Sequence, residues 1–175
     1  MTQLYTGHID PIWDLEEISK LDYYFDGSGE FQDPVVVEDW RNTFGREFKV
    51  GMKVDHKRRQ PDCQSQILDV LRQQGYSIQH EGCAWFRMLP GDIIPEHSDS
   101  YTQYCKFHGL EQQDVSRIIV FLQDWQPGFL FEAGGKSFSH YQAGTFVCWR
   151  AGTLHMAGNL SRVPRYTLQI TGIIS

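Results

Sequence analysis

The second half of the chain alternates short apolar runs with glycine- and proline-containing turns. From about Tyr76 onward this pattern favours extended structure, and it predicts strands at residues 77–89, 116–124, 129–132, 136–141, 145–149 and 165–174. The turns between them are marked by Pro90-Gly91, Pro127-Gly128, Gly134-Gly135, Gly144 and Gly152. Many short strands without helices between them indicate an antiparallel sandwich or barrel.

The first 80 residues have a more mixed pattern and predict short helices at 11–18, 37–44 and 64–74. The third has the clearest signal, because Ile67, Val70 and Leu71 recur at helical spacing and Gly75 follows. Residues 25–34 between the first two helices are predicted to be a loop. We expect residues 1–80 to be a supporting segment packed on the sheet formed by 81–175, all in one domain.

Composition and charge narrow the functional classes. The chain is 41% apolar and has a formal net charge of −6, which gives no electrostatic reason to bind nucleic acid or an anionic membrane. No apolar run approaches the roughly 20 residues that span a bilayer. The four cysteines form no C-x-x-C pair and no segment resembles a signal peptide, so we expect a cytoplasmic protein. Nothing in the sequence indicates the oligomeric state.

The first candidate for chemistry is the pair His97 and Asp99. On an extended strand, side chains two residues apart share a face, so this imidazole and carboxylate would converge. Together they are two thirds of a metal site that lacks a second histidine. The alternative is a surface turn, because Pro95, Glu96 and Ser98 are all turn or cap residues.

His155 is the best candidate for a third ligand. It lies just beyond the predicted strand 145–149, where the edge of a sheet can present a side chain to a cavity. Ten residues later comes Arg165, whose planar guanidinium can bind a carboxylate through two hydrogen bonds, and Thr167 can add a third from the same face.

The last predicted strand has a polar and an apolar face. Its alternation places Arg165, Thr167, Gln169 and Thr171 on one side and Tyr166, Leu168 and Ile170 on the other. In a simple sandwich the polar side would face solvent. A role in binding requires instead that this side line a cavity.

In this order, His97, Asp99, His155, Arg165 and Thr167 resemble the motif set of the iron(II)- and 2-oxoglutarate-dependent oxygenases. The resemblance covers roughly residues 83–173. The motifs are similar to those of the prolyl-hydroxylase-like and aspartyl-hydroxylase-like branches. It implies a mainly β, cupin-like jelly roll, or double-stranded β-helix, over residues 81–175. It also implies that His97, Asp99 and His155 are catalytic residues that hold Fe(II).

The resemblance further implies that Arg165 and Thr167 bind the distal carboxylate of 2-oxoglutarate, with ascorbate as a candidate reductant. The reaction expected is hydroxylation of a substrate C–H bond, with release of succinate and carbon dioxide. The substrate would be a small molecule or an amino-acid or protein side chain. Two other functions remain open: a zinc hydrolase that uses the same ligands with Glu96 as base, and a cupin-like binding module without catalysis.

Candidates for the substrate side are Arg87, Tyr101 and Tyr104. The two tyrosines fall in residues 100–114, which are predicted to form a long loop that acts as a lid. Arg87 and Arg117 are interpreted either as surface ion-pair partners or as contacts to an acidic substrate. Trp85, on the same strand face as Arg87, is expected to pack in the core.

Overall fold

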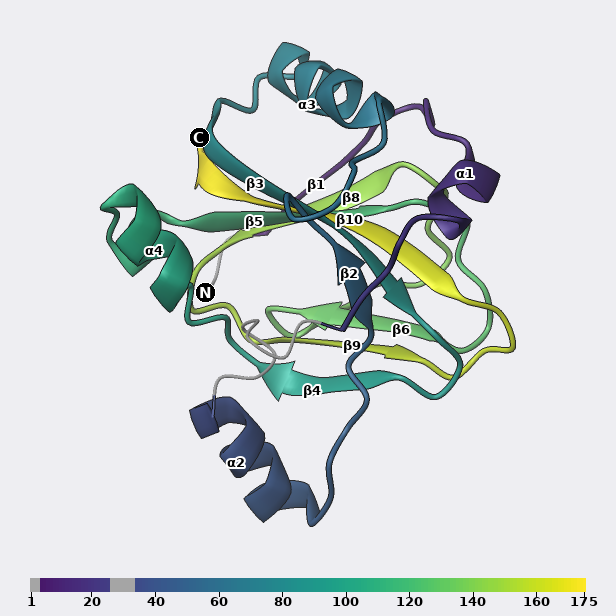
Figure 1. Cartoon of the computed structure of the whole chain (residues 1–175), viewed down its shortest axis with the longest axis vertical. Coiled ribbons are helices and arrows are strands. Elements are labelled where there is room, and N and C mark those ends of the chain that lie inside the picture. The colour runs from purple at the N-terminus through teal and green to yellow at the C-terminus, as the bar shows by residue number, and fades with distance from the viewer. Residues whose placement is uncertain (1–3, 26–33) are drawn as a thin grey trace.

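Two antiparallel sheets face each other in the computed structural model, which describes residues 4–25 and 34–175 (Figure 1). The larger sheet contains, in spatial order, β1 (Tyr5–His8), β8 (Thr145–Arg150), β5 (Ser116–Phe121), β10 (Arg165–Ile174), β3 (Ile78–Met88) and β2 (Met52–Val54). The smaller sheet contains β4 (Ile93–His97), β9 (His155–Asn159), β6 (Phe129–Ala133) and β7 (Lys136–Ser137).

From β3 onward the chain passes back and forth between the two sheets. Strands β3, β5, β8 and β10 lie in the larger sheet, and β4, β6, β7 and β9 lie in the smaller one. All the neighbouring pairs are antiparallel. This interleaved order is the double-stranded β-helix predicted from the sequence, and the predicted fold class is confirmed.

Strand β10 runs between β3 and β5 and is covered on both faces. Every residue from Arg165 to Ile174 except Ile173 is buried. The face with Leu168 and Ile170 belongs to a core that also includes residues of α1 (Leu15–Ser19) and α3 (Cys63–Gln73). The opposite, polar face lines a cavity between the sheets, so the solvent-exposed alternative is wrong.

The N-terminal helices pack on the sheets as expected. Helix α3 buries Ile67, Leu68 and Leu71 in the core on the side of the larger sheet away from the smaller one, at the top of Figure 1. Helix α2 (Pro34–Phe44) contributes Trp40 to a separate cluster with Phe86, Met88 and Ile94. That cluster lies beside the cavity, because Phe86, Met88 and Ile94 also line it.

Several predicted boundaries were wrong. The predicted loop 100–114 contains helix α4 (Thr102–His108), which ends at Gly109 in the left-handed conformation, and a 3-10 helix, η2 (Gln112–Asp114). The predicted strand 136–141 is reduced to the two residues of β7. The helix expected at 11–18 begins only at Leu15, because the Asp14 carboxylate caps it by accepting a hydrogen bond from the Glu16 amide.

Four strands were not among those predicted: β1, β2, β4 and β9. Most of the predicted loop 25–34 lies outside the described residues. In the described part of the chain, no helix is both long and apolar enough to cross a membrane.

Candidate metal centre

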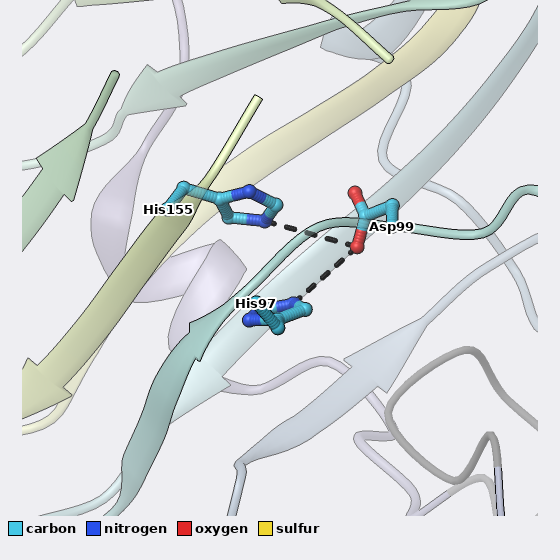
Figure 2. Close-up of side chains that lie close together, drawn as sticks. All are labelled: His97, Asp99 and His155. Carbon is cyan, nitrogen blue, oxygen red and sulfur yellow. Dashed lines mark ion pairs between the residues drawn. The ribbon is translucent and has the colours of Figure 1, made fainter. Parts of the chain in front are cut away.

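Strand pairing brings the two candidate histidines together. His97 ends β4, His155 begins β9, and the antiparallel register of these strands places the two residues directly opposite each other. Their ring centroids are 4.4 Å apart. Asp99 follows His97 by two residues, and the three side chains point toward one another (Figure 2).

The three side chains present their ligand atoms to a common point. Oδ1 of Asp99 lies 3.4 Å from Nε2 of His97 and 3.7 Å from Nε2 of His155, and all three residues are buried. One ligand atom from each lies within 4.8 Å of the others. Atoms that bind one metal ion at about 2.0–2.2 Å are separated by similar distances, so the residues present fit a divalent cation.

Hydrogen bonds to the backbone set the tautomers of both imidazoles. Nδ1 of His97 is 2.8 Å from the Pro95 carbonyl oxygen, and Nδ1 of His155 is 3.0 Å from that of Thr153. Because a carbonyl oxygen can only accept, each Nδ1 carries the proton and each Nε2 presents a lone pair toward Oδ1 of Asp99. Burial lowers the pKa of His155 to about 4, so this imidazole is neutral at pH 7, as metal binding requires.

Arg117 lies beside Asp99 on the side away from the imidazoles. Its Nη2 donates a 2.9 Å hydrogen bond to Oδ2 of Asp99, and its Nη1 donates to Oε1 of Gln169 at 3.3 Å. Burial raises the pKa of Asp99, but the positive charge of Arg117 lowers it, and the pKa lies well below its ordinary value. Arg117 is therefore an ion-pair partner, but a buried one that lines the cavity and not a surface one.

Arg165 enters the same cavity from the start of β10 and is only 3% exposed. Its Nη1 contacts Sδ of Met88 at 3.5 Å, and the guanidinium lies 5.6 Å and 5.7 Å from the ring centroids of Phe121 and Phe131. Within residues 4–25 and 34–175, no carboxylate pairs with it, and neither Nε nor Nη2 has a hydrogen-bond partner. An isolated buried charge is costly, so this position fits an anionic group supplied from outside the chain.

One cavity contains both the three candidate metal ligands and Arg165. Its polar lining consists of the three candidate ligands, the two arginines, Thr167 and Gln169. The rest is apolar and comes from both sheets: Phe86, Met88, Ile94, Ile119, Phe131, Trp149 and Ala157. Apolar walls with a few convergent polar groups are typical of small-molecule sites.

The structure does not bring the three substrate-side candidates to this cavity. The Arg87 guanidinium lies 4.4 Å from the Tyr23 ring, on the face of β3 opposite to Phe86 and Met88. Tyr104 lies on α4 and donates from its hydroxyl to the His80 carbonyl oxygen.

Tyr101 is buried, and its ring centroid lies 5.2 Å from the guanidinium carbon of Arg117. It does not line the cavity itself. Trp85 is fully buried in the core, as expected. Glu96, the base proposed for a zinc hydrolase, is exposed and is also absent from the cavity lining, which leaves that alternative without its predicted base.

Sequence reasoning missed the role of Arg117 as a partner of Asp99. One signal was present: Arg117, Ile119 and Phe121 share a strand face by period-two spacing, and that face points between the sheets. The contribution of Trp40 was also missed. Its ring lies edge-on to the His97 ring, with centroids 5.5 Å apart, and comes from a helix that carries no motif.

No known protein family and no curated protein matches the sequence. Among solved structures, a prolyl-4-hydroxylase from Pseudomonas putida has 15% sequence identity and a TM-score of 0.53, covering 91% of this chain and 96% of that one. A non-heme α-ketoglutarate-dependent carbocyclase from nogalamycin biosynthesis has 15% identity and a TM-score of 0.53, covering 95% and 78%. A cupin domain from Bordetella pertussis Tohama I has 13% identity and a TM-score of 0.41, covering 75% and 99%. The hydroxylase and the carbocyclase share the fold of this chain, whose strand order is that of a double-stranded β-helix.

Proposed function

We propose that this protein is an Fe(II)- and 2-oxoglutarate-dependent oxygenase. The observation that carries the proposal is the buried guanidinium of Arg165, which has no carboxylate partner in the described part of the chain and shares a cavity with His97, Asp99 and His155. Two imidazoles and one carboxylate are the ligand set of non-heme iron oxygenases, and they leave coordination positions open.

In this proposal His97, Asp99 and His155 hold the metal through two Nε2 atoms and Oδ1. Arg165 binds the distal carboxylate of 2-oxoglutarate through Nε and Nη2, the two atoms that have no partner in the described residues. Thr167, two residues along the same strand face and 5% exposed, adds a hydroxyl to this end of the cavity. When bound, Fe(II) would supply the reaction of dioxygen with 2-oxoglutarate and a substrate C–H bond, in which one oxygen atom enters succinate, the other enters the hydroxylated substrate, and carbon dioxide is released.

The chain's own contribution is orientation and exclusion of water. The apolar walls formed by Phe131, Trp149 and Met88 strengthen the interaction between Arg165 and a carboxylate, because charges attract more strongly where water is excluded. The backbone carbonyls of Pro95 and Thr153 keep both imidazoles in the tautomer that binds metal. We propose a small molecule or an amino-acid or protein side chain as the substrate, with ascorbate as reductant.

The first test is binding of 2-oxoglutarate to anaerobic Fe(II)-loaded protein by calorimetry. We expect binding in the wild type, loss of binding in Arg165→Met, and no change in Arg162→Gln, an exposed arginine three residues away. His97→Ala should lose the metal itself.

The second test is formation of succinate from 2-oxoglutarate with added Fe(II) and ascorbate. Binding without any succinate would favour the cupin-like binding module instead. Wild-type protein that retains zinc after anaerobic purification and binds no 2-oxoglutarate would contradict the oxygenase and favour the hydrolase.

A further inference from the structure

The ion pair between Arg117 and Asp99, together with Gln169, joins three separate segments of the chain. Arg117 comes from β5, Gln169 from β10, and Asp99 from the segment after β4. Arg117 and Asp99 are 7% and 5% exposed, and the pair is closed at 2.9 Å. The hydrogen bond to Gln169 and the ring of Tyr101 fix the guanidinium from two further sides.

This arrangement gives the two oxygens of Asp99 different surroundings. Oδ1 lies 3.4 Å and 3.7 Å from the two Nε2 atoms, while Oδ2 accepts the hydrogen bond from Arg117. A carboxylate can bind a metal through one oxygen or through both. A guanidinium bound to Oδ2 draws electron density from this oxygen. The hydrogen bond also opposes the rotation of the carboxylate that would bring Oδ2 to a metal.

We infer that Arg117 is a positioning residue for the metal site: by binding Oδ2 of Asp99, it limits this carboxylate to one metal bond, through Oδ1. The inference rests on the metal site of the proposed oxygenase but concerns the coordination number of the metal and not the reaction.

Coordination number matters because 2-oxoglutarate and dioxygen together need three positions. In a six-coordinate site, two imidazoles and a one-oxygen carboxylate leave about three positions. If Asp99 bound through both oxygens, only about two would remain, and the cosubstrate and dioxygen could not bind together. Arg117 thus acts through Asp99 without touching either.

The test uses Mn(II), which binds oxygen and nitrogen ligands and relaxes the protons of the waters bound to it. Water-proton relaxation of Mn(II)-saturated protein, without 2-oxoglutarate, counts the exchangeable waters on the metal. We expect about three in the wild type and about two in Arg117→Gln, so the relaxation enhancement should fall by about one third. Arg117→Lys retains a cation and a donor near Oδ2 and should keep the wild-type value.

Two matched controls separate this effect from a general disturbance. Arg165→Gln removes the other buried arginine of the same cavity and should keep about three waters while losing 2-oxoglutarate. Arg150→Gln changes an exposed arginine on the neighbouring strand β8 and should change nothing. If metal-free Arg117→Gln does not fold, the same measurement is made on Arg117→Gln and Arg117→Met folded with saturating Mn(II), which balances part of the charge of Asp99.

The inference is overturned if the uncharged variants keep the wild-type water count. It is also overturned if a folded Arg117→Gln protein no longer binds Mn(II), because Arg117 would then be required for binding and not for coordination number. Wild-type protein that binds no metal would overturn both this inference and the proposed function. Metal binding without 2-oxoglutarate binding would overturn the proposed function alone.

Discussion

The two buried arginines of the cavity have opposite surroundings. Arg117 has a carboxylate at 2.9 Å and an amide oxygen at 3.3 Å, so its charge is balanced within the chain. Arg165 contacts a methionine sulfur and two aromatic rings, and no carboxylate pairs with it among the described residues. Removing the first arginine would therefore leave a buried carboxylate without its cation, whereas the second carries a buried charge that would oppose folding in the absence of an anion. A buried charge that has no partner in the ligand-free protein, and so lowers its stability, is typical of a binding site.

The largest expected effect is destabilisation by Arg117→Met. This substitution leaves the Asp99 carboxylate buried without its cation, and breaking such a pair costs about 3–5 kcal/mol. Urea unfolding of the metal-free protein should show this fall in the free energy of unfolding. Saturation with Mn(II) should reduce the difference, because the cation takes over part of the balance of charge at Asp99. Arg150→Met, on the exposed end of β8, is the control; an equally small change in both variants would contradict the comparison.

The next effect is stabilisation by 2-oxoglutarate through Arg165. At a free concentration of 100 times the dissociation constant, a ligand that binds only the folded state raises the free energy of unfolding by about 2.7 kcal/mol. We expect this increase in anaerobic Fe(II)-loaded wild type and none in Arg165→Met at the same concentration. Pyruvate has the same 2-oxo acid group but no second carboxylate, so its weaker effect should be equal in the two proteins. A larger effect of pyruvate in the wild type would show that Arg165 does not bind the distal carboxylate.

Much of the fold could be predicted because four strands of the larger sheet carry their own signal. Strands β3, β5, β8 and β10 have long apolar or alternating runs, and these were assigned from the sequence. Strand β9 was missed, since its sequence HMAGN contains a glycine and little that favours extended structure. It is a strand because β4 and β6 supply hydrogen-bond partners on both sides, which is a tertiary effect.

The candidate site divides in the same way. The H-x-D spacing and the histidine after a strand can be recognised in the sequence, and strand pairing brings His97 and His155 together. The pairing of Arg117 with Asp99 could not be predicted, because it joins residues 18 positions apart whose approach depends on the packing of one sheet against the other. The alternation in β10 was equally ambiguous until the second sheet was seen to cover its polar face.

Arg165→Met is expected to raise the free energy of unfolding slightly, in contrast to the large decrease expected for Arg117→Met. Methionine has a similar length and removes a buried charge that has no ion pair in the described residues, so the metal-free protein should become more stable by about 1 kcal/mol. Lost contacts between the guanidinium and the rings of Phe121 and Phe131 keep the gain small. Urea unfolding of Arg165→Met beside Arg117→Met measures the contrast directly. A fall in stability for both variants would indicate that Arg165 has a stabilising partner after all.

The smallest expected change in stability is that of a Gln169 variant. Gln169 hydrogen-bonds to Arg117, and Arg117 in turn binds Asp99. Gln169→Leu removes one hydrogen bond to the guanidinium, and the 3.3 Å length of that contact places its contribution at the low end, at about 0.5 kcal/mol. The ion pair at 2.9 Å remains, so Mn(II) should keep its full number of bound waters. The measurement pairs urea unfolding with water-proton relaxation. A loss of bound water in Gln169→Leu would mean that Arg117 holds Asp99 only when Gln169 fixes it, and the division of roles between the two residues would have to be redrawn.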